Sequence, residues 1–274
     1  QIHAQHKGGT LQATEDGKLI AQGADEVVFL LTADTDYQMN FNPDFDNPQT
    51  YVGVNPMESA ESMMEMAKKY TYQELKERHI MDYRSLFGRV KLSLNPHAPM
   101  TLEYPSQYDL PTPQRLERYR KGQPDYKLEE LYFQYGRYLL IASSRPGNLP
   151  ANLQGMWANG VNGPWNVDYH NNINIQMNYW PACPTNLTEC NWPLIDFIRT
   201  LVKPGEKTAQ AYFDARGWTA SISANIFGFT SPLADEVMFW NFNPMAGPWL
   251  ATHIWEYYDY TRDKDFLKKI GYEL

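Results

Sequence analysis

The chain has 274 residues, of which 43% are hydrophobic and 20% are charged, so it is long enough and apolar enough to bury a substantial core. Its formal net charge is −8 and its basic residues form no run, which argues against nucleic acid as a partner. No apolar stretch approaches the roughly 18 residues that a membrane-spanning helix needs, so we expect no membrane partner.

Aromatic side chains are unusually common, at 14% of the chain, with eight Trp and 19 Tyr. Such rings can stack on the apolar faces of sugars, while their polar tips and nearby amides bind hydroxyl groups. A large helical core rich in Trp would have the same composition. Composition alone leaves both interpretations open.

Cys183 and Cys190 are the only cysteines. Their spacing is not that of a zinc-binding pair and no His cluster accompanies them, so we expect no metal site. An oxidising compartment would allow them to pair, but we favour two unpaired, partly buried thiols. Phosphate-loop, dinucleotide-binding, serine-hydrolase and zinc-protease motifs are absent, so we expect no cofactor.

Residues 1–56 have the pattern of β-structure. Residues 11–14 and 18–21 flank Glu15-Asp16-Gly17, a sequence typical of a β-hairpin turn. Residues 27–31 form a continuous apolar run, which predicts a strand buried on both faces. Two or three short strands rarely form a stable domain by themselves. We therefore interpret residues 1–56 as the C-terminal part of a larger β domain.

Residues 57–127 are predicted to form a helical linker followed by a connector. Apolar residues recur at helical spacing within residues 59–69 and 72–87, and residues 89–94 alternate as a short strand. Prolines are frequent in residues 95–125, which predicts a connector on the surface rather than a domain core.

From residue 128 to residue 274 the pattern is mainly helical. Residues 128–142 follow the i, i+3, i+4, i+7 spacing closely, and further helices are predicted at residues 192–202, 206–216 and 249–261. The intervening loops are long and rich in Asn, Gly, Pro and Trp. This arrangement favours an α-helical toroid whose functional site lies in the loops.

The stretch from His170 to Ile175 carries the most informative polar side chains. If it is extended, successive side chains point to opposite sides, so His170, Asn172 and Asn174 share one side. Ile173 and Ile175 then face the body of the fold. Amides and a neutral imidazole can position a water molecule and bind sugar hydroxyls. A buried polar network that satisfies loop backbone is the alternative interpretation.

Two other segments combine amides or acids with Trp. Residues 148–157 mix Asn and Gln with Trp157, and the sequence favours sugar contact and loop scaffolding about equally. Asp235-Glu236 precedes Trp249, which opens a predicted helix and would suit a stacking platform. In the same helix, His253 and Glu256 are expected to face neighbouring helices rather than a ligand.

Glycosidases usually need two carboxyl groups on either side of the bond that they break. The candidates here are Asp168, Glu189, Glu236 and Glu256, and no spacing distinguishes a pair among them. The general acid and base therefore cannot be derived from residue spacing.

Several motifs together resemble glycoside hydrolase family 95. They are residues 135–147, 149–157, 172–174 and 177–182, together with Arg78-His79, Asp82-Tyr83, Leu86-Phe87 and Arg89-Val90 in the linker helix. The resemblance implies a multidomain α + β protein with an N-terminal β-sandwich, a helical linker, an (α/α)6 barrel and a C-terminal β domain. The chain would be a fragment that holds the end of the sandwich (residues 1–56), the linker (57–127) and the first barrel helices (128–274).

The same resemblance implies inverting hydrolysis of terminal α-1,2-linked L-fucose, or of L-galactosides as in some members of the family. By motif match, Asn174 is the base that activates water and Asn172 assists it. His170, Trp249 and Glu236 match positions that contact the sugar. The implied partner is a fucosylated oligosaccharide or polysaccharide, and the implied location is secreted or periplasmic in a bacterium.

The family's general acid and the Asp that polarises the amide are expected beyond Leu274, together with the rest of the polypeptide. The chain by itself would then be inactive. A non-catalytic carbohydrate-binding or scaffold protein is the alternative if the chain truly ends at Leu274.

Overall fold

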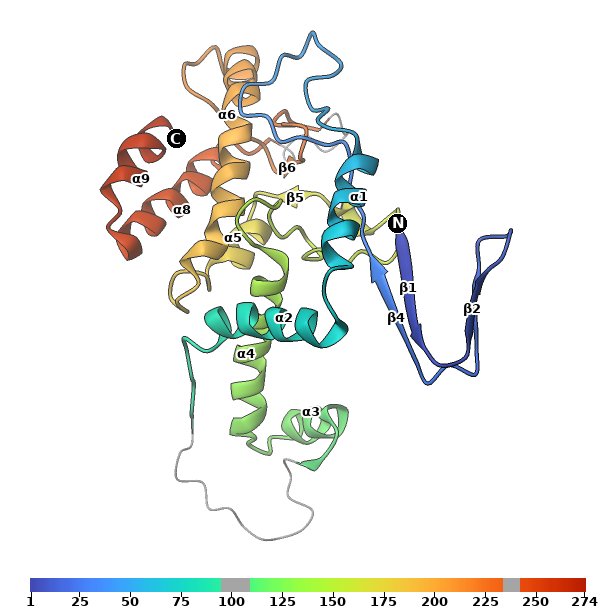
Figure 1. The fold of residues 1–274 in the computed structure, drawn as a ribbon. Coiled ribbons are helices and arrows are strands. Elements are labelled where there is room, and N and C mark those ends of the chain that lie inside the picture. The colour runs from blue at the N-terminus through green and yellow to red at the C-terminus, as the bar shows by residue number, and fades with distance from the viewer. Residues whose placement is uncertain (95–108, 234–241) are drawn as a thin grey trace. The chain divides into compact units, whose positions relative to one another are not determined.

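A computed structural model describes residues 1–94, 109–233 and 242–274 (Figure 1). These residues form α-helices and small two-stranded antiparallel sheets, which fits a multidomain α + β protein. They divide into two compact units, Gln1–Tyr83 and Arg84–Leu274. The three-part division at residues 56 and 127 stays a prediction.

In the first unit, β1 (Ile2–Lys7) pairs antiparallel with β4 (Glu26–Leu31), and Ile2 lies opposite Leu31 (Figure 1). Within the described chain, this second strand is not buried on both faces as predicted. Phe29 is 57% exposed and Leu31 is 71% exposed. A continuous apolar run identifies a strand, but it does not determine how many layers cover that strand.

The β-hairpin prediction is confirmed. β2 (Thr10–Ala13) pairs with β3 (Leu19–Gln22), and Ala13 lies opposite Leu19 across the turn. Gly17 adopts a φ of 79°, a left-handed conformation that glycine reaches without steric cost. The Asp-Gly signal therefore places this turn correctly.

Two helices follow, and both were predicted. α1 (Pro56–Ala67) begins after Asn55, whose side chain accepts a hydrogen bond from the Met57 amide. α2 (Tyr72–Phe87) begins with a capping box. In that box the Thr71 amide donates to Glu74 over 2.7 Å and the Glu74 amide donates to the Thr71 hydroxyl over 3.3 Å.

The strand predicted at residues 89–94 does not form. Side chains of α4 (Tyr126–Ser143) bind the carbonyls at the end of α2 and just after it instead. Arg137 donates to the carbonyl oxygens of Leu86 and Phe87, and Gln134 donates to that of Val90. Within residues 89–94, side chains of α4 thus satisfy the Val90 carbonyl and, through Glu130, the Leu94 amide, so these two groups need no partner strand.

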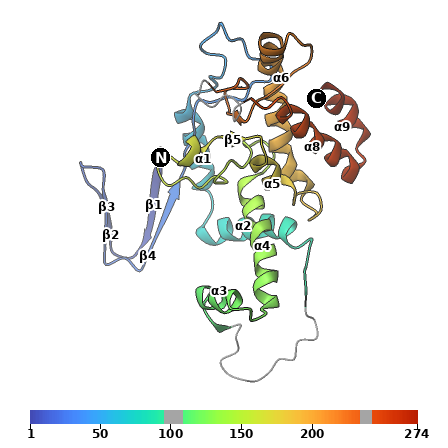
Figure 2. The same cartoon turned by 180° about the vertical axis from the view of Figure 1, so that it is seen from behind.

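A helix that the sequence analysis missed lies in the Pro-rich connector. α3 (Thr112–Arg120) follows Pro111 and has Pro113 in its first turn, where the missing amide hydrogen costs nothing. The prolines were interpreted only as marks of a connector, and here they also start a helix. Both ribbon views show α3 beside the N-terminal end of α4 (Figures 1 and 2).

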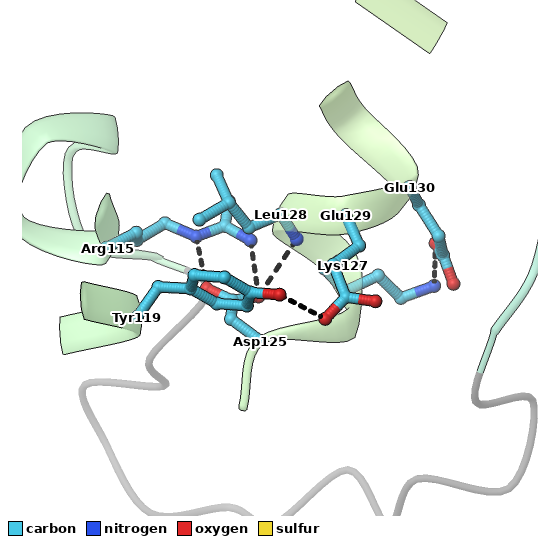
Figure 3. Close-up of polar contacts among 7 residues, drawn as sticks. All are labelled: Arg115, Tyr119, Asp125, Lys127, Leu128, Glu129 and Glu130. Atoms are coloured by element: carbon cyan, nitrogen blue, oxygen red, sulfur yellow. Dashed lines mark hydrogen bonds and ion pairs between the residues drawn. The ribbon is translucent and has the colours of Figure 1, made fainter. Parts of the chain in front are cut away.

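A buried ion pair joins α3 to the start of α4 (Figure 3). The Arg115 guanidinium donates two hydrogen bonds of 2.8 Å to the Asp125 carboxylate, and both side chains are at most 10% exposed. Asp125 also caps α4 by accepting from the Leu128 amide over 2.9 Å. The adjacent guanidinium holds the pKa of Asp125 below its ordinary value.

The two helices predicted at residues 192–202 and 206–216 are one continuous helix, α6 (Trp192–Phe213), with Pro204 inside it. Tertiary packing carries the helix past the proline. A Cβ at Gly205 would lie 2.6 Å from the carbonyl oxygen of Thr219, so the glycine lets this segment approach α6 closely.

The core of the second unit gathers around α6. α8 (Ala246–Thr261) confirms the helix predicted at residues 249–261, and α9 (Lys264–Lys269) follows it. Trp192 meets the rings of Tyr257 and Phe266 edge to face, each with a centroid distance of 5.7 Å. These ring contacts pack α8 and α9 against the start of α6, and both ribbon views show α8 beside α6 (Figures 1 and 2).

Cys183 and Cys190 are both buried and unpaired, which confirms the preferred interpretation of the cysteines. Burial raises the pKa of Cys183 to about 12 and that of Cys190 to about 11. Separately, none of the helices within the described ranges is both long and apolar enough to span a bilayer.

The Asp125→Asn substitution should destabilise the second unit. The amide oxygen introduced there would still accept from the Leu128 amide, but Arg115 would lose its buried counterion. Removing one partner of a buried pair typically costs about 3 kcal/mol or more, and urea unfolding at pH 7 measures this loss. Because the folded pKa of Asp125 is lowered, its contribution is present above the ordinary pKa of 3.8 and is lost as pH falls through the folded pKa.

The matched control is Glu206→Gln, which breaks the partly exposed pair with Lys203. This substitution should lower the free energy of unfolding by less than roughly 0.5 kcal/mol, because exposed ion pairs contribute little to stability. If the two variants lost equal free energy of unfolding, the buried Arg115–Asp125 pair would stabilise the unit no more than an exposed pair does.

Candidate functional site

The candidate site begins on a two-residue strand. β5 (Tyr169–His170) pairs antiparallel with β6 (Ser223–Ala224), and the Asn171 amide donates to the Ile222 carbonyl over 2.6 Å. Residues 171–173 then form a turn, and α5 (Asn174–Tyr179) follows directly. The prediction that residues 170–175 are extended is therefore wrong after residue 170.

A local hydrogen bond and a backbone reversal account for this turn. The Gln176 side chain in α5 reaches back and donates to the Asn171 carbonyl over 2.7 Å, which closes the turn. Ile173 adopts a φ of 154°, a value that β-branched residues rarely take. The alternating side-chain pattern predicted for this segment consequently breaks down.

The two isoleucines show the consequence. Ile175 is 2% exposed and packs into the body of the unit as predicted, but Ile173 is 40% exposed. The prediction that His170, Asn172 and Asn174 share one side assumed that side chains alternate along a strand. Because residues 171–173 form a turn, the backbone does not direct these three side chains into a common cavity by alternation.

The amides of this segment divide into two classes. Asn171 and Gln176 are fully buried, and their side chains donate to the carbonyl oxygens of Ser221 and Asn171. Asn172 and Asn174 are exposed, and neither side chain makes a hydrogen bond with the rest of the described chain. The buried pair holds the backbone, and the exposed pair remains available to a ligand or to water.

The structural role of Asn171 and Gln176 was not predicted from the sequence. Their residue types are the same as those of the exposed amides, so composition cannot separate them. Only the place of each residue in the turn and in α5 decides which side chains are buried.

His170 is held by Asp168. The Nε2 atom of His170 lies 2.8 Å from Oδ1 of Asp168, and the two side chains are 19% and 17% exposed. Burial raises the pKa of Asp168 above its ordinary value, and the neighbouring His170 opposes that shift. The spacing i, i+2 on a strand would have predicted this pairing, because such residues share a face.

The backbone that leads to Asp168 is unusual. Trp165, Asn166 and Val167 have φ values of 51°, 60° and 54°, so three successive residues other than glycine are left-handed. Left-handed backbone at such residues is costly and often accompanies functional sites. Gly163 belongs to the same arrangement, because a Cβ there would lie 2.1 Å from the Val167 side chain.

A second loop is fixed to α5. The Tyr179 hydroxyl accepts from the Ala151 amide over 2.8 Å, and the Asn178 side chain donates to the Asn152 carbonyl over 3.0 Å. The Tyr179 hydroxyl also shares a 2.7 Å hydrogen bond with Ser144 at the end of α4. This predicted cluster of amides and Trp thus has a scaffold that positions it beside α5.

The other predicted site residues lie elsewhere or outside the described ranges. Trp249 lies in the first turn of α8 and is half-buried, and no hydrogen bond within the described ranges joins it to His170, Asn172 or Asn174. Glu236 falls within 234–241, outside the described residues.

The remaining carboxylates have different surroundings. Glu189 accepts two hydrogen bonds from Arg89, of 2.9 and 2.7 Å, and this pairing lowers its pKa, which favours a structural role. Glu256 is half-buried, and burial raises its pKa. His253 is 3% exposed, which confirms that it faces the interior.

The family can now be identified. Residues 71–274 match the model described as the glycosyl hydrolase family 95 catalytic domain, and the chain belongs to this family. The family comprises glycoside hydrolases, so the fold and the exposed amides belong to a protein of that class.

Similar proteins carry α-fucosidase names. The chain is 41% identical over 267 residues to "Alpha-L-fucosidase 2" of Arabidopsis thaliana, which covers 97% of the chain and 30% of that protein. It is 34% identical over 258 residues to "Probable alpha-fucosidase A" of Aspergillus niger, covering 93% of the chain and 31% of that protein. A protein of the same name from Aspergillus oryzae is 36% identical over 185 residues, covering 67% of the chain and 25% of that protein.

The stability of the second unit should depend on pH through His253. Burial lowers the pKa of His253 from 6.5 to about 4, so the unfolded chain binds a proton that the folded chain excludes. Stability should therefore fall as pH drops from about 6.5 to about 4, by on the order of 3 kcal/mol at about 1.4 kcal/mol per pH unit.

Urea unfolding between pH 7 and pH 4 measures this slope. The His253→Gln variant removes the titrating group. Its free energy of unfolding should therefore fall by about 3 kcal/mol less than that of the wild type over this pH range. A variant that keeps the wild-type slope would assign the pH dependence to other groups.

Proposed function

We propose that the protein is an inverting exo-glycosidase that removes terminal α-1,2-linked L-fucose from glycans. In this proposal Asn174 binds and activates the attacking water, and Asn172 assists it. The observation that carries the proposal is the division of the amides around α5. Asn171 and Gln176 are buried and occupied, whereas Asn172 and Asn174 are exposed and make no hydrogen bond with other described residues.

Carboxamides suit the placement of a water molecule. Each side-chain oxygen can accept a hydrogen bond from the water, and each NH₂ group can donate one to a sugar hydroxyl. Inversion requires water to attack from the face opposite the leaving group. A neutral amide is a weak base, so the reaction also needs a polarising carboxylate and a general acid, which we expect outside these 274 residues.

His170 is proposed to bind a hydroxyl of the same sugar. Its Nε2 atom is next to Asp168, which leaves Nδ1 as the ring nitrogen available to the substrate. Trp249 is proposed as an aromatic wall of the pocket and Glu236 as a polar contact, on the strength of the motif match. Family membership and the relatives' names support L-fucose as the sugar.

The wider arrangement is also a proposal. Residues 1–56 would complete a β-sandwich, residues 57–127 would form the linker, and the helices from residue 128 would open an (α/α)6 barrel. The natural partner would be a fucosylated oligosaccharide or polysaccharide, and the protein would be secreted or periplasmic. The chain spans about a third of the length of two of the relatives that it matches, so the rest of the barrel would come from further polypeptide.

Asn174→Ala in the full-length enzyme should lower kcat on an α-1,2-fucosylated oligosaccharide by roughly 10²–10⁴-fold, as expected for loss of a general base. Release of L-fucose measures the rate, and NMR at early times identifies the anomer released. Asn42→Ala, at an exposed asparagine in the first unit, is the matched control and should retain full activity.

Three outcomes would contradict parts of the proposal. Normal fucose release by Asn174→Ala would reject the assigned base. Faster release from L-galactosides than from L-fucosides in parallel assays would change the sugar. Binding of the glycan without any cleavage by the full-length protein would favour a non-catalytic sugar-binding role.

A further inference from the structure

Asp168 is a largely buried carboxylate that faces the ring of His170. Its Oδ1 atom is fully buried and has no hydrogen-bond partner within the described ranges, apart from the contact of 2.8 Å with the Nε2 atom of His170. No Lys or Arg of the described chain forms an ion pair with Asp168. A buried carboxylate oxygen without a donor is costly, so this oxygen needs the imidazole as its donor.

The residue between the two partners fixes the place of the pair. Tyr169 is 5% exposed, and its ring packs on that of Phe197 with a centroid distance of 4.4 Å. Asp168 is extended, with a φ of −93° and a ψ of −165°, and β5 begins directly after it. Neighbouring residues on extended backbone point to opposite faces, so Asp168 and His170 lie together on the face opposite Tyr169.

The chain reaches Asp168 through a costly backbone. Trp165, Asn166 and Val167 are all left-handed, and none of them is glycine. Such a conformation persists only where the surrounding structure fixes it, and it is found preferentially at functional sites. The strained approach therefore supports a functional role for the carboxylate beside His170.

The contact determines which ring nitrogen of a neutral His170 carries the proton. An ionised carboxylate can only accept hydrogen bonds, so it selects the ring form that is protonated on Nε2. Nδ1 then has a free lone pair and accepts a hydrogen bond. Without the carboxylate, the ring could carry its proton on Nδ1 instead, which would make that atom a donor. Asp168 thus decides how His170 meets a sugar hydroxyl.

We propose that Asp168 is a positioning residue that acts on the reaction only through His170. It holds the imidazole ring with Nδ1 unprotonated, so that His170 accepts a hydrogen bond from a hydroxyl of the terminal sugar. This inference rests on the proposed function, in which His170 binds that sugar. It gives one of the candidate carboxylates of the sequence a role other than that of general acid or base.

A double-mutant cycle in the full-length enzyme tests this role. Asp168→Asn keeps the size of the side chain and removes its charge. It should lower kcat/KM for an α-1,2-fucosylated trisaccharide by roughly tenfold, mainly through KM, because His170 binds the sugar and transfers no proton. His170→Gln should cause a similar loss. The double variant should be no worse than His170→Gln alone, because Asp168 then has no ring to position.

Asp196→Asn is the matched control. Asp196 also pairs with a neighbouring cation in the second unit, Arg199 at 3.0 Å, and its side chain is 23% exposed against 17% for Asp168. This variant should retain wild-type kinetics. If the double variant lost a further tenfold relative to His170→Gln, Asp168 would act through the fold and the proposal would be overturned. Wild-type kinetics in Asp168→Asn would overturn it as well.

A second measurement needs no change at Asp168. Nitrogen-15 NMR of the histidine-labelled enzyme, at a pH where the ring is neutral, shows which ring nitrogen carries the proton. The spectrum of His170→Gln identifies the His170 signals. We expect the proton on Nε2 and none on Nδ1. The opposite tautomer would overturn the proposal even if Asp168→Asn did not fold.

Binding of free L-fucose separates this inference from the proposed function. Titration calorimetry of the full-length protein should show that Asp168→Asn weakens L-fucose binding by roughly tenfold when His170 is present and has no effect in His170→Gln. That result in a protein that releases no fucose would refute the proposed function and keep the role of Asp168. Normal fucose release by the wild type, with additive losses from the two substitutions, would do the reverse.

Discussion

The Tyr179 hydroxyl is the contact on which the arrangement of the candidate site depends. It shares a hydrogen bond with the Ser144 hydroxyl and accepts from the Ala151 amide, and Ser144 in turn donates to the Cys190 carbonyl. One buried phenol thus joins the end of α4, the following loop and α5. Burial raises its pKa, so it stays neutral and can act as donor and acceptor together.

The short helix α5 presents polar groups with opposite roles on its two sides. Gln176 and Tyr179 point inward and satisfy the backbone of neighbouring segments, which fixes the helix. Asn174 lies at its exposed start, and the Asn178 side chain donates to the Asn152 carbonyl of the neighbouring loop. A site formed in this way needs few ordered side chains of its own, because the buried amide and phenol already determine where the exposed amides lie.

Local patterns predicted most of the helices and the first hairpin, and contacts between distant segments explain the errors. The Asp-Gly turn and the periodicity of residues 72–87 are properties of a few neighbouring residues, and both predictions are confirmed. The strand predicted at residues 89–94 does not form, and side chains of α4 bind its Val90 carbonyl. The break expected near Pro204 failed because α6 is held by packing against Thr219. No local pattern contains that information.

In the candidate site, too, local sequence patterns did not predict which side chains are buried. The sequence identified Asn172 and Asn174 through their motif, but the reason first given for their cooperation, alternation along a strand, does not hold. Their availability depends instead on Asn171 and Gln176, which have equivalent side chains and are buried. In a segment with many amides, residue type therefore shows which groups can bind a sugar or a water molecule. The turn after β5 determines which of these amides are exposed and therefore available to bind a sugar or a water molecule.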